Sequence, residues 1–170
     1  IDDLLAFSRL GRKPISTREV DMRELVRGAL ADVQSQRGGT SSNVQVQVGE
    51  LPPADGDPAL LRHIVINLLG NALKFARPGV LPEVVVSSRT AGNKLRLSVT
   101  DKGIGVEPKD AQRIFGMFER IGNNETPGTG IGLAIVRKCA QRMQGKAGLT
   151  PRAGDRQELT EVWVELELST

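Results

Sequence analysis

The 170-residue sequence predicts a two-layer α/β sandwich, with helices packed on one face of a mixed, largely antiparallel sheet. Helix-like and strand-like patterns alternate along the chain, and strands joined by short turns stand in its second half. Hydrophobic residues make up 39% of the chain, which is enough for one buried core, and charged residues make up 25%. The length suits one main domain with a short attachment.

Two helical patterns with identifiable ends occupy the N-terminal part. Residues 1–10 read as the end of an amphipathic helix, which Gly11 and Pro14 interrupt. A second helix begins after Asp21, with Glu24 three residues later, as in a capping box. Apolar residues then recur at helical spacing, so one face of this helix is expected to pack on the core.

A strand and a long helix follow. Val44, Val46 and Val48 alternate with polar residues, which predicts a half-buried strand. The segment PPADGDP reads as a turn, and Asp57 is a suitable cap for a helix that extends to about residue 76.

The second half reads as strands that enclose two further helices. Trp163 shares a strand face with three glutamates, and we expect it to be partly exposed or covered by a neighbour. The predicted strands cover 83–88, 94–101, 147–151 and 158–168, and the predicted helices cover 108–118 and 131–143.

The composition argues against two classes of function, nucleic-acid binding and membrane insertion. A net charge of +3 is spread along the chain and aromatic residues are only 3%, which argues against a nucleic-acid partner. No apolar run approaches the roughly 18 residues that a bilayer-spanning helix requires, so no membrane contact is expected within this segment. The single cysteine, Cys139, allows no internal disulfide and fits a reducing, cytoplasmic compartment, where it is expected only to pack.

The long helix carries an unusual polar strip. On a helical wheel, Asn71, Lys74 and His63 all lie within about 40° of Asn67. An ordinary solvated face remains an alternative, although such a face normally carries Glu, Lys and Arg rather than amides, which are poor helix formers. Apolar residues occupy the opposite side: Leu61, Val65, Leu68, Leu69, Ala72 and Leu73.

Two glycine-rich segments accompany this strip. In TDKGIGV, Asp101 continues the inward-facing parity of an apolar strand, so its carboxylate should meet a donor, such as the amino group of adenine. A tight turn capped by Asp101 is the alternative. In PGTGIGLA, three glycines precede a helix whose first N–H groups could bind phosphate, unless the segment is only a hinge. No Gly-Lys-Ser/Thr follows, so this is not a P-loop.

Four motifs in order resemble a known family. NLLGNALKF, DKGIGV, IFGMFERI and GTGIGLA are similar to the N, G1, F and G2 boxes of sensor histidine kinases, which belong to the GHKL superfamily with DNA gyrase, MutL and the ninety-kilodalton heat-shock chaperone. PGTGIGLA and LLAFSRLGR resemble the phytochrome-type kinases in particular. The resemblance implies a Bergerat-type ATP-binding fold for residues 14–170. It also implies that residues 1–13 are the end of a dimerisation and phosphoacceptor hairpin.

The resemblance assigns roles to the first two boxes. Asn71 matches the asparagine that coordinates Mg²⁺ on ATP, and Asn67 matches its partner one turn earlier. Lys74 matches a phosphate-contacting lysine and Phe75 a ring near adenine. Asp101 matches the aspartate that accepts a hydrogen bond from the adenine amino group, and the G1 glycines are Gly103 and Gly105.

The remaining boxes are expected to contact phosphate. Arg120, which follows the F-box residues Phe115 and Phe118, matches a basic residue that reaches the γ-phosphate, and residues 106–127 match the ATP lid. The G2 contacts are Gly128, Thr129, Gly130, Gly132 and Leu133.

The residue type at position 67 distinguishes two branches of this superfamily. ATPase members carry a glutamate there that activates water, whereas an amide cannot act as a general base. The expected function is therefore transfer of the ATP γ-phosphate to a histidine on the upstream hairpin, in a dimer, for phosphorelay to a response-regulator receiver domain. An anti-sigma-type Ser/Thr kinase and a non-catalytic nucleotide sensor are the alternatives. His63, on the box helix, is expected to be structural or a peripheral pocket contact. The resemblance places the acceptor histidine on the upstream hairpin, so this segment should not phosphorylate itself.

Overall fold

A computed structural model describes residues 2–36, 45–74, 83–101, 108–116, 130–151 and 160–168. Two 3-10 turns, η1 (Pro108–Asp110) and η2 (Arg113–Phe115), lie between the strand that ends at Asp101 and the helix that begins at Gly132. The helices are α1 (Asp2–Leu10), α2 (Met22–Gln36), α3 (Pro58–Lys74) and α4 (Gly132–Arg142). The strands are β1 (Arg18–Val20), β2 (Gln45–Val48), β3 (Ala54–Gly56), β4 (Glu83–Ala91), β5 (Lys94–Asp101), β6 (Lys146–Pro151) and β7 (Thr160–Leu168).

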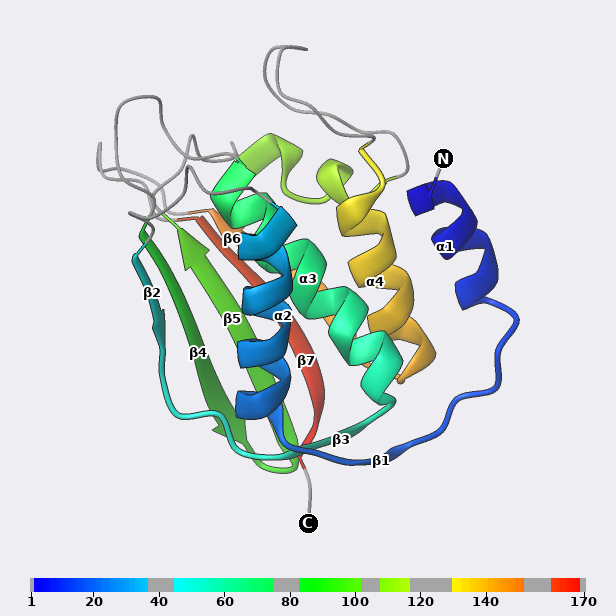
Figure 1. The fold of residues 1–170 in the computed structure, drawn as a ribbon, viewed down its shortest axis with the longest axis horizontal. Coiled ribbons are helices and arrows are strands. Elements are labelled where there is room, and N and C mark those ends of the chain that lie inside the picture. The colour runs from blue at the N-terminus through cyan, green and yellow to red at the C-terminus, as the bar shows by residue number, and fades with distance from the viewer. Residues whose placement is uncertain are drawn as a thin grey trace.

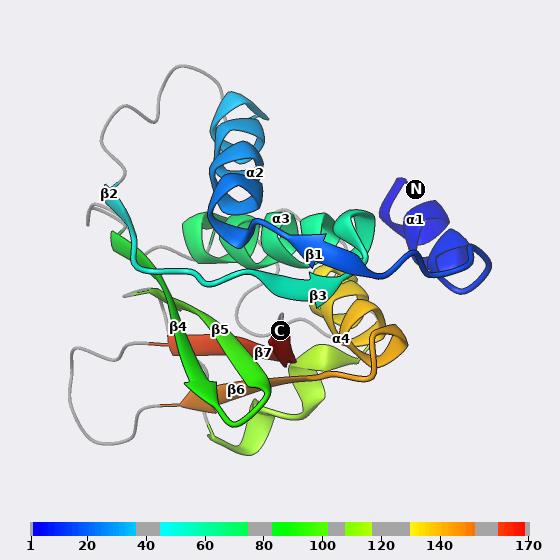
Figure 2. The ribbon, with the colours of Figure 1, turned by 90° about the horizontal axis from the view of Figure 1, so that it is seen from below.

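The strands form one mixed sheet in the order β1-β3-β7-β5-β4-β2, and β6 also pairs with β7. Only the β2–β4 pair is parallel among the described pairs. β7 is the centre of the sheet because β5 lies along one side of it and both β6 and β3 lie along the other. In Figure 2, α2 and α3 lie above β5, β6 and β7.

Helices α2, α3 and α4 cover one face of the sheet, and α3 contacts both of its neighbours (Figure 1). The core fills the space between the layers, where α3 contributes its apolar side and β5 contributes Leu95, Leu97 and Val99. The predicted two-layer α/β sandwich is therefore confirmed. No described helix is both long enough and apolar enough to cross a bilayer.

Two aspartates fix the starts of helices, as the sequence predicts. Asp21 Oδ1 accepts a hydrogen bond from the Glu24 N–H at 3.1 Å. Asp57 Oδ1 accepts from the backbone N–H groups of Ala59 and Leu60, which caps α3. Asp57 Oδ2 also accepts from the Ser16 N–H at 2.9 Å, so this carboxylate ties the segment before β1 to the start of α3.

The short helix α1 packs against α4, outside the row that covers the sheet (Figure 1). The Lys138 ammonium lies 4.5 Å from the centroid of the Phe7 ring, a cation–π contact. Arg142 Nη1 donates a hydrogen bond to the carbonyl oxygen of Leu10, the last residue of α1. The two contacts between α1 and α4 therefore both use cationic side chains from the C-terminal half of α4.

Two sequence predictions are wrong. The segment PPADGDP contains a strand, β3, which pairs with β1 in the register Arg18↔Gly56. Each strand is three residues long, and the polar, Gly-containing sequence of β3 resembles a turn. Pairing with its neighbour decides the conformation. The helix predicted over 108–118 is instead the two 3-10 turns η1 and η2, separated by Ala111 and Gln112, and η2 ends where Gly116 adopts an extended conformation.

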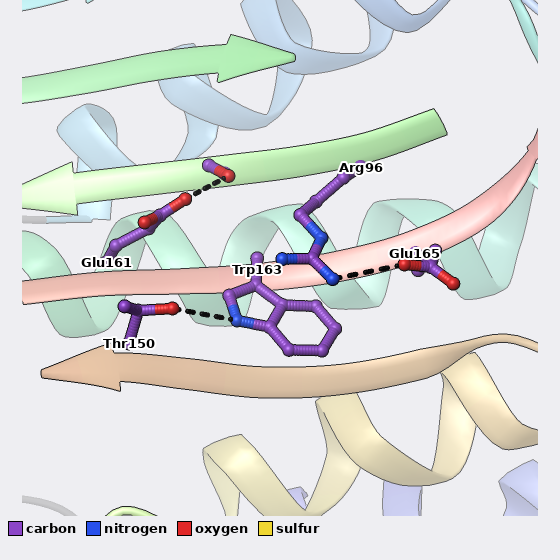
Figure 3. A network of polar contacts seen from close by, with 6 residues as sticks. Arg96, Thr150, Glu161, Trp163 and Glu165 are labelled. Carbon is purple, nitrogen blue, oxygen red and sulfur yellow. Dashed lines mark hydrogen bonds and ion pairs between the residues drawn. The ribbon is translucent and has the colours of Figure 1, made fainter. Parts of the chain in front are cut away.

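The face of the sheet opposite the helices carries a polar network around Trp163 (Figure 3). The Arg96 guanidinium lies 3.8 Å from the indole centroid and donates to Glu165 at 3.2 Å, while the indole N–H donates to Thr150 Oγ1. Gly148 stands directly opposite Trp163 on β6. Trp163 is half-buried and Arg96 lies over its ring, so the expectation that this tryptophan is partly exposed or covered by a neighbour is confirmed.

Candidate functional site

Three elements bring the predicted site residues to one end of the molecule. The C-terminal end of α3, the carboxyl end of β5 and the N-terminal end of α4 lie together at the top of Figure 1. These ends carry Lys74, Asp101 and Gly132 respectively. The sequence boxes that lie far apart in the chain therefore meet at one edge of the fold.

The polar strip on α3 faces the start of α4. Asn67 Nδ2 donates to the carbonyl oxygen of His63 at 2.7 Å, which orients its carboxamide. A Cβ at Gly132 would lie 3.0 Å from Asn67 Oδ1 and 3.7 Å from Asn71 Oδ1, so both amide oxygens border the first residue of α4. The expected apolar side is confirmed as buried: Leu61, Val65, Leu68, Leu69, Ala72 and Leu73.

The start of α4 has a backbone suited to a bound anion. Gly130 has φ of +74°, a left-handed conformation that favours glycine. The N-cap residue Ile131 makes no side-chain capping bond, so its side chain does not occupy the N–H groups of the first turn. Leu133 is half-buried and packs against the core, which anchors this first turn beside α3.

Asp101 ends the central strand β5 on the inward-facing parity that the sequence predicts. Leu95, Leu97 and Val99, two residues apart along the same face, are all buried. Asp101 itself is half-buried and stands between Val84 of β4 and Thr160 of β7 in the sheet register. Its carboxylate therefore lies at the inner edge of the sheet, where a polar group must be matched by a hydrogen-bond partner.

Two titratable groups of α3 and α4, His63 and Cys139, favour their neutral forms. Burial lowers the pKa of His63, and the neighbouring Arg62 charge adds to this effect, so the imidazole is neutral near pH 7. Burial raises the pKa of the Cys139 thiol to about 12, which leaves it an unreactive packing group on α4. The Cys139 thiol therefore lacks the character of a nucleophile at neutral pH.

Six predicted site residues lie outside the described part of the chain. The sequence did not single out Arg137 on α4, whose guanidinium carbon lies 5.0 Å from the centroid of the Phe115 ring. The only signal in the sequence was Phe115 itself, within the F box, because a cation on a helix surface resembles an ordinary solvated residue. The six are Phe75, Gly103, Gly105, Arg120, Gly128 and Thr129.

The described site residues fit a metal-bound polyphosphate. Side-chain amide oxygens are among the hard ligands that Mg²⁺ accepts, usually together with phosphate oxygens and water. Two such oxygens face the space that a side chain at position 132 would fill. Among the described residues, no group of three or more His, Cys, Asp or Glu side chains is placed to hold a metal ion.

A family model of the histidine kinase-, DNA gyrase B- and HSP90-like ATPases matches residues 56–170. The chain belongs to this ATPase family. The match includes the whole of α3, β5 and α4, the three elements that form the site. The order of the boxes and the fold thus lead to the same assignment.

Named relatives narrow the family assignment to sensor kinases. The chain is 34% identical over 160 residues to the histidine protein kinase DivJ of Caulobacter vibrioides, covering 91% of this chain and 26% of the relative. It is 30% identical over 156 residues to the phytochrome-like protein Cph1 of Synechocystis, covering 91% of this chain and 20% of the relative. The chain thus spans about a fifth to a quarter of the length of these relatives.

A solved structure with a bound nucleotide analogue is similar over nearly the whole chain. Full-length ShkA in complex with AMPPNP superposes with a TM-score of 0.77 at 32% identity, covering 99% of this chain and 35% of that one. The sensor histidine kinase AruS of Pseudomonas aeruginosa is 33% identical over 178 residues, covering 99% of this chain and 18% of the relative. The family match and these relatives identify the chain as a sensor histidine kinase ATP-binding catalytic domain.

Proposed function

We propose that this domain binds ATP with Mg²⁺ and transfers the γ-phosphoryl group to a histidine on an upstream helical hairpin. The observation that carries the proposal is the meeting of Asn67, Asn71 and Gly132 at the start of α4. Two amide oxygens and the positive end of a helix dipole there face one small space, which suits a triphosphate with its metal.

Each described site residue has a role in this proposal. Asn71 supplies an oxygen ligand to Mg²⁺, and Lys74, one turn further along α3, offsets phosphate charge. Asp101 accepts a hydrogen bond from the adenine amino group at the edge of the sheet. Bound Mg²⁺ would neutralise charge on the phosphates, and the G2 backbone of Gly130, Gly132 and Leu133 would contact their oxygens.

Residues outside the described part complete the proposed site. Phe75, Gly103 and Gly105 are proposed to lie beside adenine. Arg120 is proposed to reach the γ-phosphate, and Gly128 and Thr129 are proposed to extend the phosphate contacts of α4. These roles are supported by the positions of the residues within the matched sequence boxes.

The proposed reaction is phosphoryl transfer rather than hydrolysis. An imidazole nitrogen of the acceptor histidine forms a bond to the γ-phosphorus, and the bond to the oxygen that bridges to the β-phosphate breaks, releasing ADP. Asn67 cannot take a proton from water because its carboxamide is not basic and its Nδ2 already donates to His63. The domain therefore acts through positioning and charge stabilisation.

The partners follow from this chemistry. We propose that the acceptor histidine belongs to a hairpin that dimerises, that α1 is the end of its second helix, and that the phosphoryl group passes to a response-regulator receiver domain. A cytoplasmic location fits the ATP substrate and the buried reduced thiol. Similarity to Cph1 supports a phytochrome-type kinase, and similarity to DivJ shows that other sensor kinases are comparably close.

Calorimetry with Mg·AMPPNP tests the binding step. The domain should bind this nucleotide, and Asn71→Ala should abolish the Mg²⁺ dependence of binding. The transfer step is tested by adding an acceptor hairpin from a related kinase with γ-labelled ATP. Acid-labile label should appear on the hairpin only when the domain is present. Failure of the wild-type domain to bind any adenine nucleotide would overturn the proposal.

A further inference from the structure

The outer edge of β2 is open to a further strand. β2 (Gln45–Val48) is the last strand in the sheet order and pairs with β4 along one side, in the parallel register Val48↔Val86. It forms one margin of the sheet in Figure 1. No strand in the described part of the chain pairs with its other side. An edge of this kind presents backbone N–H and C=O groups that can bind another strand.

The register shows which backbone groups of β2 point away from β4. The Gly49 N–H donates to the Val86 carbonyl oxygen at 2.8 Å, so position 49 faces β4. The N–H and C=O groups of one residue lie on the same side of a strand, and successive residues alternate between the two sides. The two glutamines of β2 therefore bond to β4 as Gly49 does, whereas Val46 and Val48 direct their backbone groups outward.

β2 lacks the features that protect the other edges of this sheet. Among the described pairs, β1 and β6 also pair along one side only. β1 carries Arg18 and Glu19. β6 carries Lys146 and Pro151. Charges and prolines on an edge strand oppose pairing with another chain, but β2 has the uncharged, proline-free sequence QVQV.

A second copy of β2 matches this edge. An antiparallel pairing about a two-fold axis at Gln47 sets Val46 of one copy opposite Val48 of the other. Both residues direct their backbone groups outward, so each such pair exchanges two N–H···O=C hydrogen bonds. Residues that stand opposite each other share a face, so partly buried valines meet valines and the two Gln47 amides meet each other. A shift of one residue would set an outward-directed valine against a glutamine that bonds to β4, which fixes the register.

We infer that two copies of this chain associate edge to edge through β2, with Gln47 on the two-fold axis. The pairing joins two sheets into one and leaves no β2 edge for a third copy, so association stops at the dimer. A strand of four residues from each copy makes a small contact, so the dimer is weak, with a Kd on the order of 0.1 mM. The inference does not depend on nucleotide binding.

Cysteine crosslinking of the 170-residue chain tests the register. The two copies of residue 47 form a non-hydrogen-bonded pair with Cα atoms about 4.5 Å apart, a separation that a disulfide spans. Gln47→Cys should therefore form a covalent dimer in oxidised glutathione, which dithiothreitol reverses. Gln45→Cys is the matched control, because it faces Gly49 of the other copy and should crosslink at least about tenfold more slowly. The native Cys139 is buried and should not contribute.

A charge exchange tests the two-fold axis. Sedimentation equilibrium over concentrations that bracket the Kd measures the dimer. Gln47→Lys and Gln47→Glu should each weaken it by about tenfold or more, because like charges meet on the axis. An equimolar mixture of the two variants should recover the dimer, since lysine then faces glutamate. Gln45→Lys adds the same charge to the same strand face and should dimerise as the wild type does.

A proline variant separates the outer edge of β2 from its inner edge. Val46→Pro removes an outward N–H but no bond to β4, so it should abolish the dimer while thermal unfolding still shows a folded domain. A wild-type chain that stays monomeric at about ten times the expected Kd would overturn the inference. Equal crosslinking by the two cysteine variants, a dimer that Gln47→Lys leaves intact, or no recovery in the mixture would overturn it as well.

Discussion

Gly132 meets Asn67 so closely that a single methyl group would fill the space between the start of α4 and the α3 amides. A Cβ at position 132 would stand 3.0 Å from Asn67 Oδ1, tighter than ordinary van der Waals contact. The absence of a side chain at this residue keeps two amide oxygens accessible from the end of α4. The first prediction concerns this contact.

Gly132→Ala should weaken Mg·AMPPNP binding by about tenfold, because the added methyl displaces Asn67 from its orientation toward the phosphates. Calorimetry with the two proteins measures the loss. Gly70→Ala on the neighbouring helix α3 is the matched control, since a Cβ there meets nothing within 4 Å. The control should bind normally and gain about 0.5–1 kcal/mol of unfolding free energy, because alanine is the better helix former. Equal binding by Gly132→Ala and wild type would contradict the assigned site.

Asp101→Asn should reduce affinity for adenine nucleotides by about tenfold or more, because an amide can no longer accept from the adenine amino group as a charged acceptor does. Competition between ATP and GTP measures the effect on base selectivity, which should also fall. Thermal unfolding of the variant without nucleotide checks that the sheet is intact. Unchanged selectivity with normal stability would remove Asp101 from the base-binding role.

Asp57 makes the stability of the domain depend on pH. Burial opposes ionisation of this carboxyl, but backbone hydrogen bonds from Ser16, Leu60 and Ala59, with the Arg142 charge, outweigh burial and lower its pKa. A carboxyl whose pKa is lower in the folded state stabilises the fold above its unfolded pKa of about 3.9. That contribution disappears as the pH falls through the lower, folded pKa.

Urea unfolding of Asp57→Asn between about pH 5 and pH 2 tests this linkage. Asparagine is also a good helix cap, so the variant should retain much of the capping energy while its stability falls less steeply with acid than that of the wild type. Asp57→Ala should cost about 1–2 kcal/mol at pH 7 through loss of the cap. Parallel pH curves for wild type and Asp57→Asn would show that the carboxyl does not contribute.

Gly148→Ala should disturb the network in Figure 3, because a Cβ at this position would overlap the indole ring of Trp163. We expect a loss of about 1–3 kcal/mol in unfolding free energy. Trp163 is the only tryptophan, so a red shift of its fluorescence reports exposure of the ring. Nucleotide affinity should stay unchanged, since this network lies on the face of the sheet away from α3 and α4; a parallel loss of affinity would refute that separation.

The sequence predicted the parts of the fold whose signal is local or strongly periodic. The cap at Asp57 and the apolar side of α3 appear as expected, because helical periodicity and capping chemistry can be read from neighbouring residues. β1 and β3 were missed because neither strand has more than three residues to show alternation, and each becomes a strand only by pairing with the other. The sequence of each segment alone contains no signal that identifies its partner strand.

The candidate site likewise contains some residues that the sequence predicted and others that only the structure reveals. Asn67, Asn71 and Asp101 were singled out because amides on a helix and a carboxylate on an apolar strand face conflict with local preference, and such conflicts often mark functional sites. Arg137 conflicts with nothing in its own helix, so only its position above Phe115 reveals it. The contact between Asn67 and Gly132 likewise depends on how α3 and α4 pack, which no single segment specifies.

The place of β7 in the sheet has a consequence for how the protein is made. β7 pairs with β5, β6 and β3, and it follows all three in the chain. During synthesis on the ribosome, each of these strands emerges before β7 does, so the edge of each strand that faces β7 remains unpaired until then. We expect the nascent chain to need protection from self-association until Leu168 has left the exit tunnel.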